Sequence, residues 1–185
     1  PYELLIATRL SAQCTDARVN LVTEVLFARF DTLESIASAP LSEMEELIRP
    51  CGLYKTKARD ILSIAQNLLS RFGGVVPDNM EDLLSLSGVG RKTANLILGD
   101  VYHLPSVVCD THCIRITNLM GLTTTKDPLK CEIELVKLLP PEKSNDFCHR
   151  MVLHGRAVCR ARSPRCEACC ANALCNYGIK TISAR

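Results

Sequence analysis

Three groups of residues in this 185-residue chain have types and spacings that could perform chemistry. A lysine, Lys92, follows closely on the paired glycines Gly88 and Gly90. An aspartate, Asp110, follows a short apolar run, and four cysteines crowd into residues 159–175. A lysine can act as an amine nucleophile or anchor a phosphate, a carboxylate can take a proton or stabilise a cation, and thiolates bind metals.

The two glycines lie between two segments with helical apolar spacing, within Leu-Ser-Gly-Val-Gly-Arg-Lys-Thr-Ala. Glycine permits positive φ and close backbone approach, and the first N–H groups of a helix have no partner inside it. A helix-hairpin-helix at about residues 80–102 could therefore hold one phosphate on the backbone of Gly88, Val89, Gly90 and Arg91. A plain turn between two helices is the alternative. The pattern is not a phosphate-binding P-loop, because Arg91 stands before Lys92 where that motif needs glycine.

Lys92 is expected at the second position of the new helix, where the helix dipole disfavours a cation. The same field lowers the pKa of a lysine, and a nucleophilic lysine must be neutral when it attacks. Lysine also binds phosphate. Its position alone leaves the roles of nucleophile and phosphate anchor equally open.

Asp110 precedes a stretch of helical periodicity and is therefore expected to cap that helix. An aspartate held at a helix N-terminus stays ionised and could also stabilise a developing cation or help to take a proton. Nearby His112 could orient another group by a hydrogen bond, although a structural role is the simpler interpretation.

The cysteine-rich loop contains Cys159, Cys166, Cys169 and Cys175, with gaps of six, two and five residues. The residues between them are small or charged, so a packed core cannot form there. Four thiolates can hold zinc or an iron–sulfur cubane, and the spacing does not distinguish them. Cys170 is assigned as a non-ligand because the two-residue gap makes the tighter chelate loop. The other six cysteines lie in apolar stretches and are assigned to packing, as small buried hydrophobes: Cys14, Cys51, Cys109, Cys113, Cys131 and Cys148.

The elements that must position these groups are predicted to be helices throughout, because apolar residues recur at spacings of three and four and strand-like alternation is nearly absent. We expect an all-α chain with helices at 2–13, 16–30, 41–49, 55–72, 80–86, 91–102, 111–120, 127–138 and 145–158. A boundary is expected near His103-Leu104-Pro105, giving one domain at 1–104 and a second, with the cysteine loop, at 105–185. Residues beside that boundary would then face a cleft.

Composition and charge narrow the class of protein. Hydrophobic residues make up 47% of the chain, enough for a core, and no run resembles a membrane span or a signal peptide, so an intracellular location is expected. Residues 141–185 carry eight basic and three acidic side chains, which favours a polyanionic partner. Aromatic residues are only 4%, without tryptophan, which argues against the stacking surfaces of single-strand and RNA binders.

Taken together, these motifs resemble the endonuclease III family, iron–sulfur DNA glycosylases and lyases of the helix-hairpin-helix superfamily. The resemblance rests on Leu-Ser-Gly-Val-Gly-Arg-Lys-Thr-Ala, Val-Val-Cys-Asp-Thr-His, Leu-His-Gly-Arg-Ala-Val-Cys with its cysteine loop, and the opening Pro-Tyr-Glu-Leu-Leu, and it spans nearly the whole chain. It implies a two-domain fold, a six-helix barrel domain plus a helical iron–sulfur domain, with the active site in the cleft. Ser87 stands where the family usually has proline.

The resemblance also implies residue roles. Lys92 would attack C1′ of the damaged nucleotide and form a Schiff base, and Asp110 would assist departure of the base. Cys159, Cys166, Cys169 and Cys175 would hold a [4Fe-4S] cluster. Gln13 would fill the gap left by the flipped nucleotide, and Leu53 would wedge against the opposite strand.

The implied function is base excision repair, with removal of oxidised or damaged pyrimidines from duplex DNA and cleavage at the abasic site. The related adenine-specific branch has a small hydroxyl residue at the position of Lys92 and a glutamate at that of Thr8, so this chain resembles the bifunctional branch. A monomer is expected, nucleoid-associated in the cytoplasm if the source is bacterial. The alternatives are a monofunctional or altered-specificity glycosylase, or a non-catalytic DNA-binding module.

Overall fold

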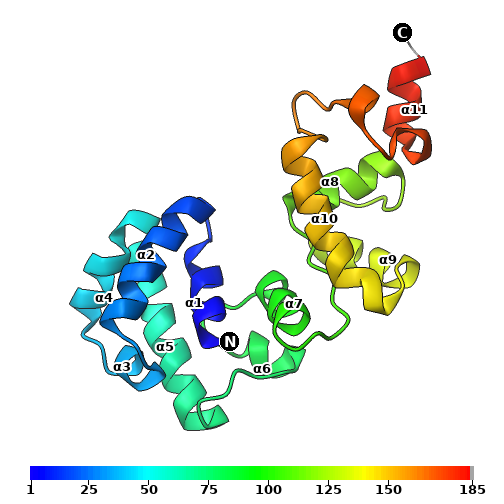
Figure 1. Cartoon of the computed structure of the whole chain (residues 1–185). Helices are drawn as coiled ribbons and strands as arrows, with labels where there is room; N and C mark the ends of the chain where they lie inside the picture. Colours follow the sequence, from blue (N-terminus) through cyan, green and yellow to red (C-terminus); the bar gives the residue numbers. More distant parts are fainter. Residues whose placement is uncertain (184–185) are drawn as a thin grey trace. The chain divides into compact units, whose positions relative to one another are not determined.

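The computed structural model describes residues 1–183; positions 184–185, the end of the second expected domain, lie outside the described residues. Within that range the chain is helical and contains no strand, as predicted (Figure 1). The chain divides into two compact units, Pro1–Tyr102 and His103–Arg185. Among the described residues, no helix combines the length and apolar character needed to cross a membrane.

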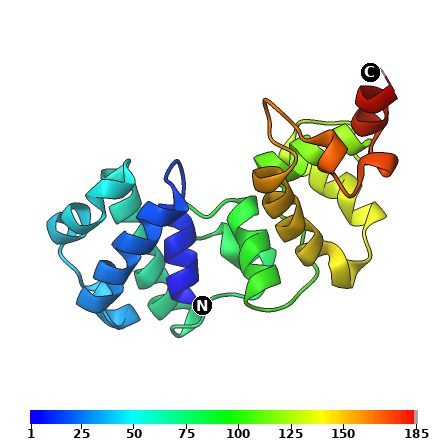
Figure 2. The same cartoon turned by 45° about the horizontal axis from the view of Figure 1, so that its top comes forward.

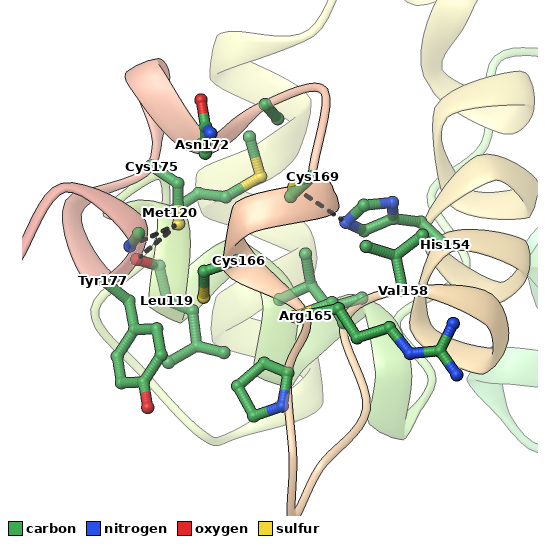
Figure 3. A pocket seen from close by; sticks show the side chains of 15 residues that line it. Leu119, Met120, His154, Val158, Arg165, Cys166, Cys169, Asn172, Cys175 and Tyr177 are labelled. Atoms are coloured by element: carbon green, nitrogen blue, oxygen red, sulfur yellow. Dashed lines mark hydrogen bonds between the residues drawn. The ribbon is translucent and has the colours of Figure 1, made fainter. Parts of the chain in front are cut away.

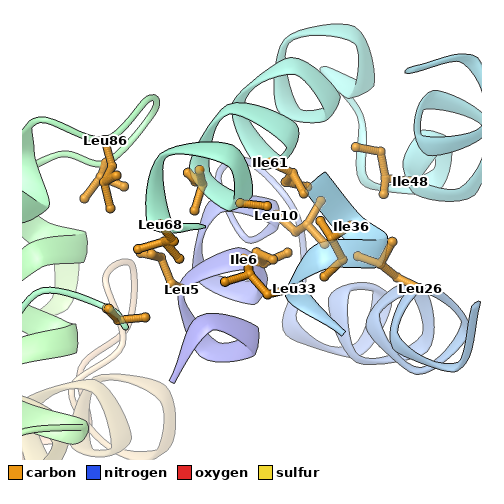
Figure 4. Packing of buried hydrophobic residues seen from close by; sticks show 14 of the residues in the cluster. Leu5, Ile6, Leu10, Leu26, Leu33, Ile36, Ile48, Ile61, Leu68 and Leu86 are labelled. Atoms are coloured by element: carbon orange, nitrogen blue, oxygen red, sulfur yellow. The ribbon is translucent and has the colours of Figure 1, made fainter. Parts of the chain in front are cut away.

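The first unit is built around one long helix, α5, which contacts α1, α3, α4 and the short 3-10 helix η1 (Figures 1 and 2). Its elements in order are α1 (Tyr2–Leu10), α2 (Asp16–Arg29), α3 (Leu33–Ala37), α4 (Leu41–Ile48), η1 (Arg49–Cys51), α5 (Tyr54–Phe72), α6 (Met80–Leu84) and α7 (Arg91–Asp100). The core lies where apolar faces of these helices meet: Leu5 and Leu10 of α1 and Ile61 and Leu68 of α5 are fully buried (Figure 4). Each such side chain stabilises the fold by about 1.5–3 kcal/mol relative to exposure.

The hairpin elements α6 and α7 pack against each other, and α7 also contacts α1. Helix α6 begins after Asn79, whose side chain accepts a hydrogen bond from the Asp82 N–H at 2.9 Å. The buried face of α7 includes Ala94, Ile97 and Leu98. The apolar side of the hairpin is therefore fixed to the core, and this attachment sets the position of the glycine turn.

The second unit contains α8 (Thr111–Met120), α9 (Pro128–Leu138), η2 (Pro141–Lys143), α10 (Ser144–Ala157), η3 (Cys166–Ala168), η4 (Asn172–Leu174) and α11 (Asn176–Ser183). Helix α8 contacts both α10 and α11. Helix α9 starts after a capping aspartate, Asp127, which accepts from the Lys130 N–H at 2.9 Å. Helix α8 ends at Met120, and the residue that follows, Gly121, adopts a positive φ of 85°.

Several helix predictions need correction. The helix predicted to run to Gln13 ends at Leu10, because the chain turns and Gln13 takes a left-handed φ of 56°. Helix α3, held by a capping box between Thr32 and Ser35, and helix α11 are absent from the prediction. Both are short, and α11 depends on contact with α8 and η4, which local periodicity does not reveal.

The cysteines assigned to packing are mostly confirmed in that role. Five are buried: Cys51, Cys109, Cys113, Cys131 and Cys148. Cys14 is half-buried and packs against the edge of the first core.

Candidate functional site

Lys92 lies just after the glycine turn, in the first turn of a helix whose N-terminus has no side-chain cap. Helix α7 begins after Gly90, no side chain caps it, and its first turn contains no acidic residue. Lys92 is its second residue and is exposed. Backbone N–H groups of a first turn without a cap need an outside acceptor, and the helix dipole favours an anion there. This end of α7 can therefore bind a phosphate with its backbone.

An ion pair packs against the backbone of the glycine turn. Arg9 of α1 and Asp60 of α5 lie 2.6 Å apart, between Nη2 and Oδ2, and both side chains are largely buried. Gly88 has a φ of 68°, and a Cβ added there would lie 2.4 Å from Nε of Arg9 and 2.6 Å from Oδ2 of Asp60. Backbone conformation and lack of space thus both require glycine at this position.

Ser87, the residue before Gly88, is tied to α5. Its hydroxyl lies 3.0 Å from the hydroxyl of Ser63 in α5. Val89 is buried, and its N–H donates to the Leu86 carbonyl at 3.2 Å. The turn is therefore anchored through side chains on both sides of Gly88.

We expect Gly88→Ala to lower the free energy of unfolding by about 1–3 kcal/mol, because alanine is strained at this φ and collides with the ion pair. Gly90→Ala is the matched control. Gly90 has a φ of −98°, and an added Cβ would meet nothing within 4 Å, so the cost there should be at most about 1 kcal/mol. Urea unfolding of both variants measures the difference, and equal costs would contradict the role given to Gly88.

Gln13 and Leu53 both lie at unusual backbone conformations on the surface. Gln13 is exposed, with a φ of 56°, in the turn after α1. Leu53 is 57% exposed with a φ of 49°, between Gly52 and α5. A non-glycine residue held in the left-handed region costs about 1–3 kcal/mol of backbone strain. Residues with such strain are concentrated at functional sites. An exposed leucine with this strain suits contact with an outside partner.

Asp110 caps α8, as the sequence predicts. Its Oδ1 accepts a hydrogen bond from the Cys113 N–H at 2.7 Å, and its side chain is half-buried. The other carboxylate oxygen has no role in this bond. His112, in the first turn of α8, is half-buried beside Gly155, and its Nδ1 has no hydrogen-bond partner among the described residues. Lys92 belongs to the first unit and Asp110 to the second.

Four cysteine side chains line one pocket in the second unit, which we call the cysteine pocket. Cys159, Cys166, Cys169 and Cys175 line it together with apolar residues of α8, such as Leu119 and Met120 (Figure 3). Cys170 is exposed and does not line it. Within residues 1–183, no group of three or more His, Cys, Asp or Glu side chains is drawn together closely enough to hold a metal ion.

Polar groups lie beside sulfurs of the cysteine pocket. Arg115 Nη1 donates to Cys159 Sγ at 3.5 Å, the Gly178 N–H donates to Cys175 Sγ at 3.4 Å, and His154 Nε2 lies 3.5 Å from Cys169 Sγ. Donors aimed at cysteine sulfur stabilise thiolates and tune metal clusters. The donor set and its surroundings therefore have the chemistry that a thiolate-bound metal or cluster requires.

Comparison with known proteins agrees with these features. The pattern of HhH-GPD superfamily base excision DNA repair proteins matches residues 6–141. Endonuclease III of Synechocystis sp. is 44% identical over 95% of this chain and 80% of its own length. A non-covalent endonuclease III–DNA complex has a TM-score of 0.89 at 41% identity, covering 97% of this chain and 85% of the other.

A further solved structure, of a trapped endonuclease III–DNA covalent intermediate, also has a TM-score of 0.89 at 41% identity, and 97% of this chain and 84% of the other are covered. The resemblance and the all-helical fold predicted from sequence are confirmed. The chain therefore belongs to the endonuclease III family within the HhH-GPD superfamily of base excision DNA repair proteins.

Proposed function

We propose that this protein is a base excision repair DNA glycosylase with an associated lyase activity, acting on oxidised or damaged pyrimidines in duplex DNA. The observation that carries the proposal is the exposed Lys92 on a helix end without a side-chain cap, directly after a glycine turn suited to phosphate. Because the turn binds phosphate through its backbone, the lysine amine is available for covalent chemistry.

Lys92 acts as the nucleophile. Its neutral amine attacks C1′ of the damaged nucleotide, and the glycosidic bond breaks with its electron pair leaving on the base, which takes up a proton. The bound nitrogen then loses a proton, and the C1′–O4′ bond of the sugar ring breaks with O4′ taking up a proton, which gives the Schiff base. The Schiff base acidifies the C2′ proton, so that removal of this proton expels the 3′-phosphate by β-elimination. Water then releases the sugar and regenerates the amine. Asp110 stabilises the cationic character that develops on the sugar as the base leaves.

Duplex binding uses the hairpin and the two exposed loops. The backbone of Gly88 to Arg91 holds a phosphate of the damaged strand. Gln13 fills the space vacated by the flipped nucleotide, and Leu53 inserts against the opposite strand. Extruding a base costs a few kcal/mol, and inserted side chains recover part of that cost. A conformation fixed in advance lowers the ordering cost of insertion, which supports these roles for Gln13 and Leu53.

The cysteine pocket would hold a [4Fe-4S] cluster through Cys159, Cys166, Cys169 and Cys175. The fit rests on four cysteines that line one pocket and on the donors beside their sulfurs. Such a cluster would supply a structural cross-link to a loop that has little apolar material of its own. The loop also carries exposed arginines suited to DNA phosphates, Arg160, Arg162 and Arg165.

Cysteine substitutions test the ligand set. The purified protein should be brown with broad visible absorbance, and Cys175→Ser should lose most of that colour, because a [4Fe-4S] cluster needs four thiolates. The exposed Cys170 gives the matched control, and Cys170→Ser should keep full absorbance. A colourless protein containing one zinc per chain would overturn the cluster assignment, and loss of colour in Cys170→Ser would overturn the choice of ligands.

The proposed activity is tested with duplex DNA carrying an oxidised pyrimidine or an abasic site, incubated with the protein and borohydride. Reduction of the Schiff base should give a covalent protein–DNA adduct, in a one-to-one complex if the enzyme acts as a monomer. Release of the base without an adduct would instead identify a monofunctional glycosylase. Binding without either reaction would identify a DNA-binding module. Because the proposed substrate is DNA, we expect the protein to act inside the cell.

A further inference from the structure

A buried lysine joins the two loops that carry Gln13 and Leu53. The Lys57 side chain is fully buried, and its Nζ donates to the Leu10 carbonyl at 2.7 Å and to the Cys51 carbonyl at 2.8 Å. Leu10 ends α1 just before the Gln13 turn, and Cys51 lies two residues before Leu53. One ammonium group therefore holds both loops at fixed positions.

A second contact joins the same two segments, and each contains one cysteine. Nη1 of Arg18, in the first turns of α2, donates to the Pro50 carbonyl at 3.4 Å. Cys14 is half-buried and directly follows Gln13, whereas Cys51 is only 2% exposed. The two segments thus face each other with one thiol on each side.

Cys14 lies between Leu10, which shares the Lys57 ammonium with Cys51, and Arg18, which donates to Pro50, so the two thiols lie on facing segments. Burial, followed by the neighbouring Cys14 side chain, raises the pKa of the Cys51 thiol to about 11, while the Lys57 ammonium acts in the opposite direction. Both cysteines also interact electrostatically with Lys57. Cys51 is thus held as a thiol beside a more accessible partner.

We propose that Cys14 and Cys51 form a dithiol site that closes to a disulfide when a small-molecule disulfide such as oxidised glutathione reaches it, and that closure displaces Gln13 and Leu53 and weakens DNA binding. The functional half of this inference rests on the proposed roles of Gln13 and Leu53. Formation of the disulfide rests only on the contacts between the loops.

The exchange proceeds in two steps. The thiolate of Cys14, the accessible member, attacks one sulfur of oxidised glutathione and expels glutathione thiolate, which takes up a proton. Cys51 then loses its proton and attacks the Cys14 sulfur of the mixed disulfide, which expels the second glutathione. Two cysteine thiols are oxidised, and one oxidised glutathione is reduced to two glutathione molecules. The buried Cys51, with its raised pKa, is poorly suited to the first attack.

Closure should disturb both DNA-contacting residues. A disulfide brings its sulfurs to about 2 Å, much closer than two neighbouring thiols that are not bonded to each other. Cys14 adjoins Gln13, and only Gly52 separates Cys51 from Leu53. A displacement of about 1 Å at a positioned group can cost about 100-fold in function. We therefore expect affinity for a duplex with an abasic-site analogue to fall at least about tenfold.

The experiment uses the purified full chain with and without oxidised glutathione. Peptide mapping by mass spectrometry should find a Cys14–Cys51 cross-link, and binding of the abasic duplex should fall and recover fully with dithiothreitol. Unchanged visible absorbance shows that the loss does not come from the cysteine pocket. Absence of the cross-link overturns the dithiol site, and a cross-link with unchanged binding overturns its effect on DNA.

Matched variants separate this site from the other thiols. Cys14→Ala, and independently Cys51→Ala, should bind DNA as the reduced parent does and should resist the oxidant, whereas Cys170→Ala should respond as the parent does. Oxidant sensitivity that persists in both loop variants contradicts the proposal. Borohydride trapping on the reduced protein tests the proposed catalysis separately: a cross-link without an adduct supports the dithiol site and rejects the catalysis, and an adduct without a cross-link does the reverse.

Discussion

Replacing Lys92 by alanine should abolish the borohydride-trapped adduct and lower the rate of strand cleavage at an abasic site by at least about 10³-fold. The physical reason is that no Schiff base can form without a primary amine, and loss of a covalent nucleophile removes a large part of catalysis. Lys92 is exposed at the start of α7, outside the buried face of that helix, so the variant should fold normally. Denaturing gel electrophoresis after borohydride treatment measures the adduct.

Lys92→Arg separates the two roles that the sequence leaves open. Arginine keeps the positive charge for phosphate but stays protonated and cannot act as an amine nucleophile. We expect Lys92→Arg to bind an abasic duplex within about threefold of the parent, a difference of less than about 1 kcal/mol, and to form no adduct. Full activity in Lys92→Arg together with failed binding in Lys92→Ala would identify a phosphate anchor and reject the nucleophile.

The features that could be predicted from the sequence are those that depend only on residues close together in the chain. The Asp110 cap depends on one side chain and an N–H three residues later, so its type and position in the sequence are sufficient. The hairpin is similarly local, because two glycines and two flanking apolar repeats define it. The family resemblance added roles for Gln13 and Leu53, which periodicity alone would have left as surface residues.

Other features needed the tertiary structure. Gly88 must be glycine partly because Arg9 and Asp60, far away in sequence, form an ion pair beneath it. Leucine disfavours the left-handed backbone conformation that Leu53 adopts. The surrounding structure must therefore impose this conformation. Cys14 and Cys51 were each assigned correctly to the apolar surroundings of the core. Their proximity to each other follows only from the packing of α2 against η1.

The second large effect is expected for Asp110→Asn, which should lower the single-turnover rate of base removal from an oxidised-pyrimidine duplex by about 10²–10⁴-fold. Asparagine is nearly isosteric and caps helices about as well as aspartate, so the hydrogen bond to the Cys113 N–H can persist. The free energy of unfolding should therefore change by at most about 1 kcal/mol. Asp110→Ala, which also loses the cap, should be less stable than Asp110→Asn by about 1 kcal/mol.

A duplex with a preformed abasic site tests whether Asp110 acts in the departure of the base. No base remains to be expelled from that substrate, so a carboxylate that assists departure is not needed there, whereas the Lys92 amine still is. Asp110→Asn should therefore lose much more rate on the oxidised-pyrimidine duplex than on the abasic duplex, and Lys92→Ala should lose both. Equal losses on the two substrates would show that Asp110 acts through the fold of α8 or through a later step, because only a role in base departure makes the effect depend on the presence of the base.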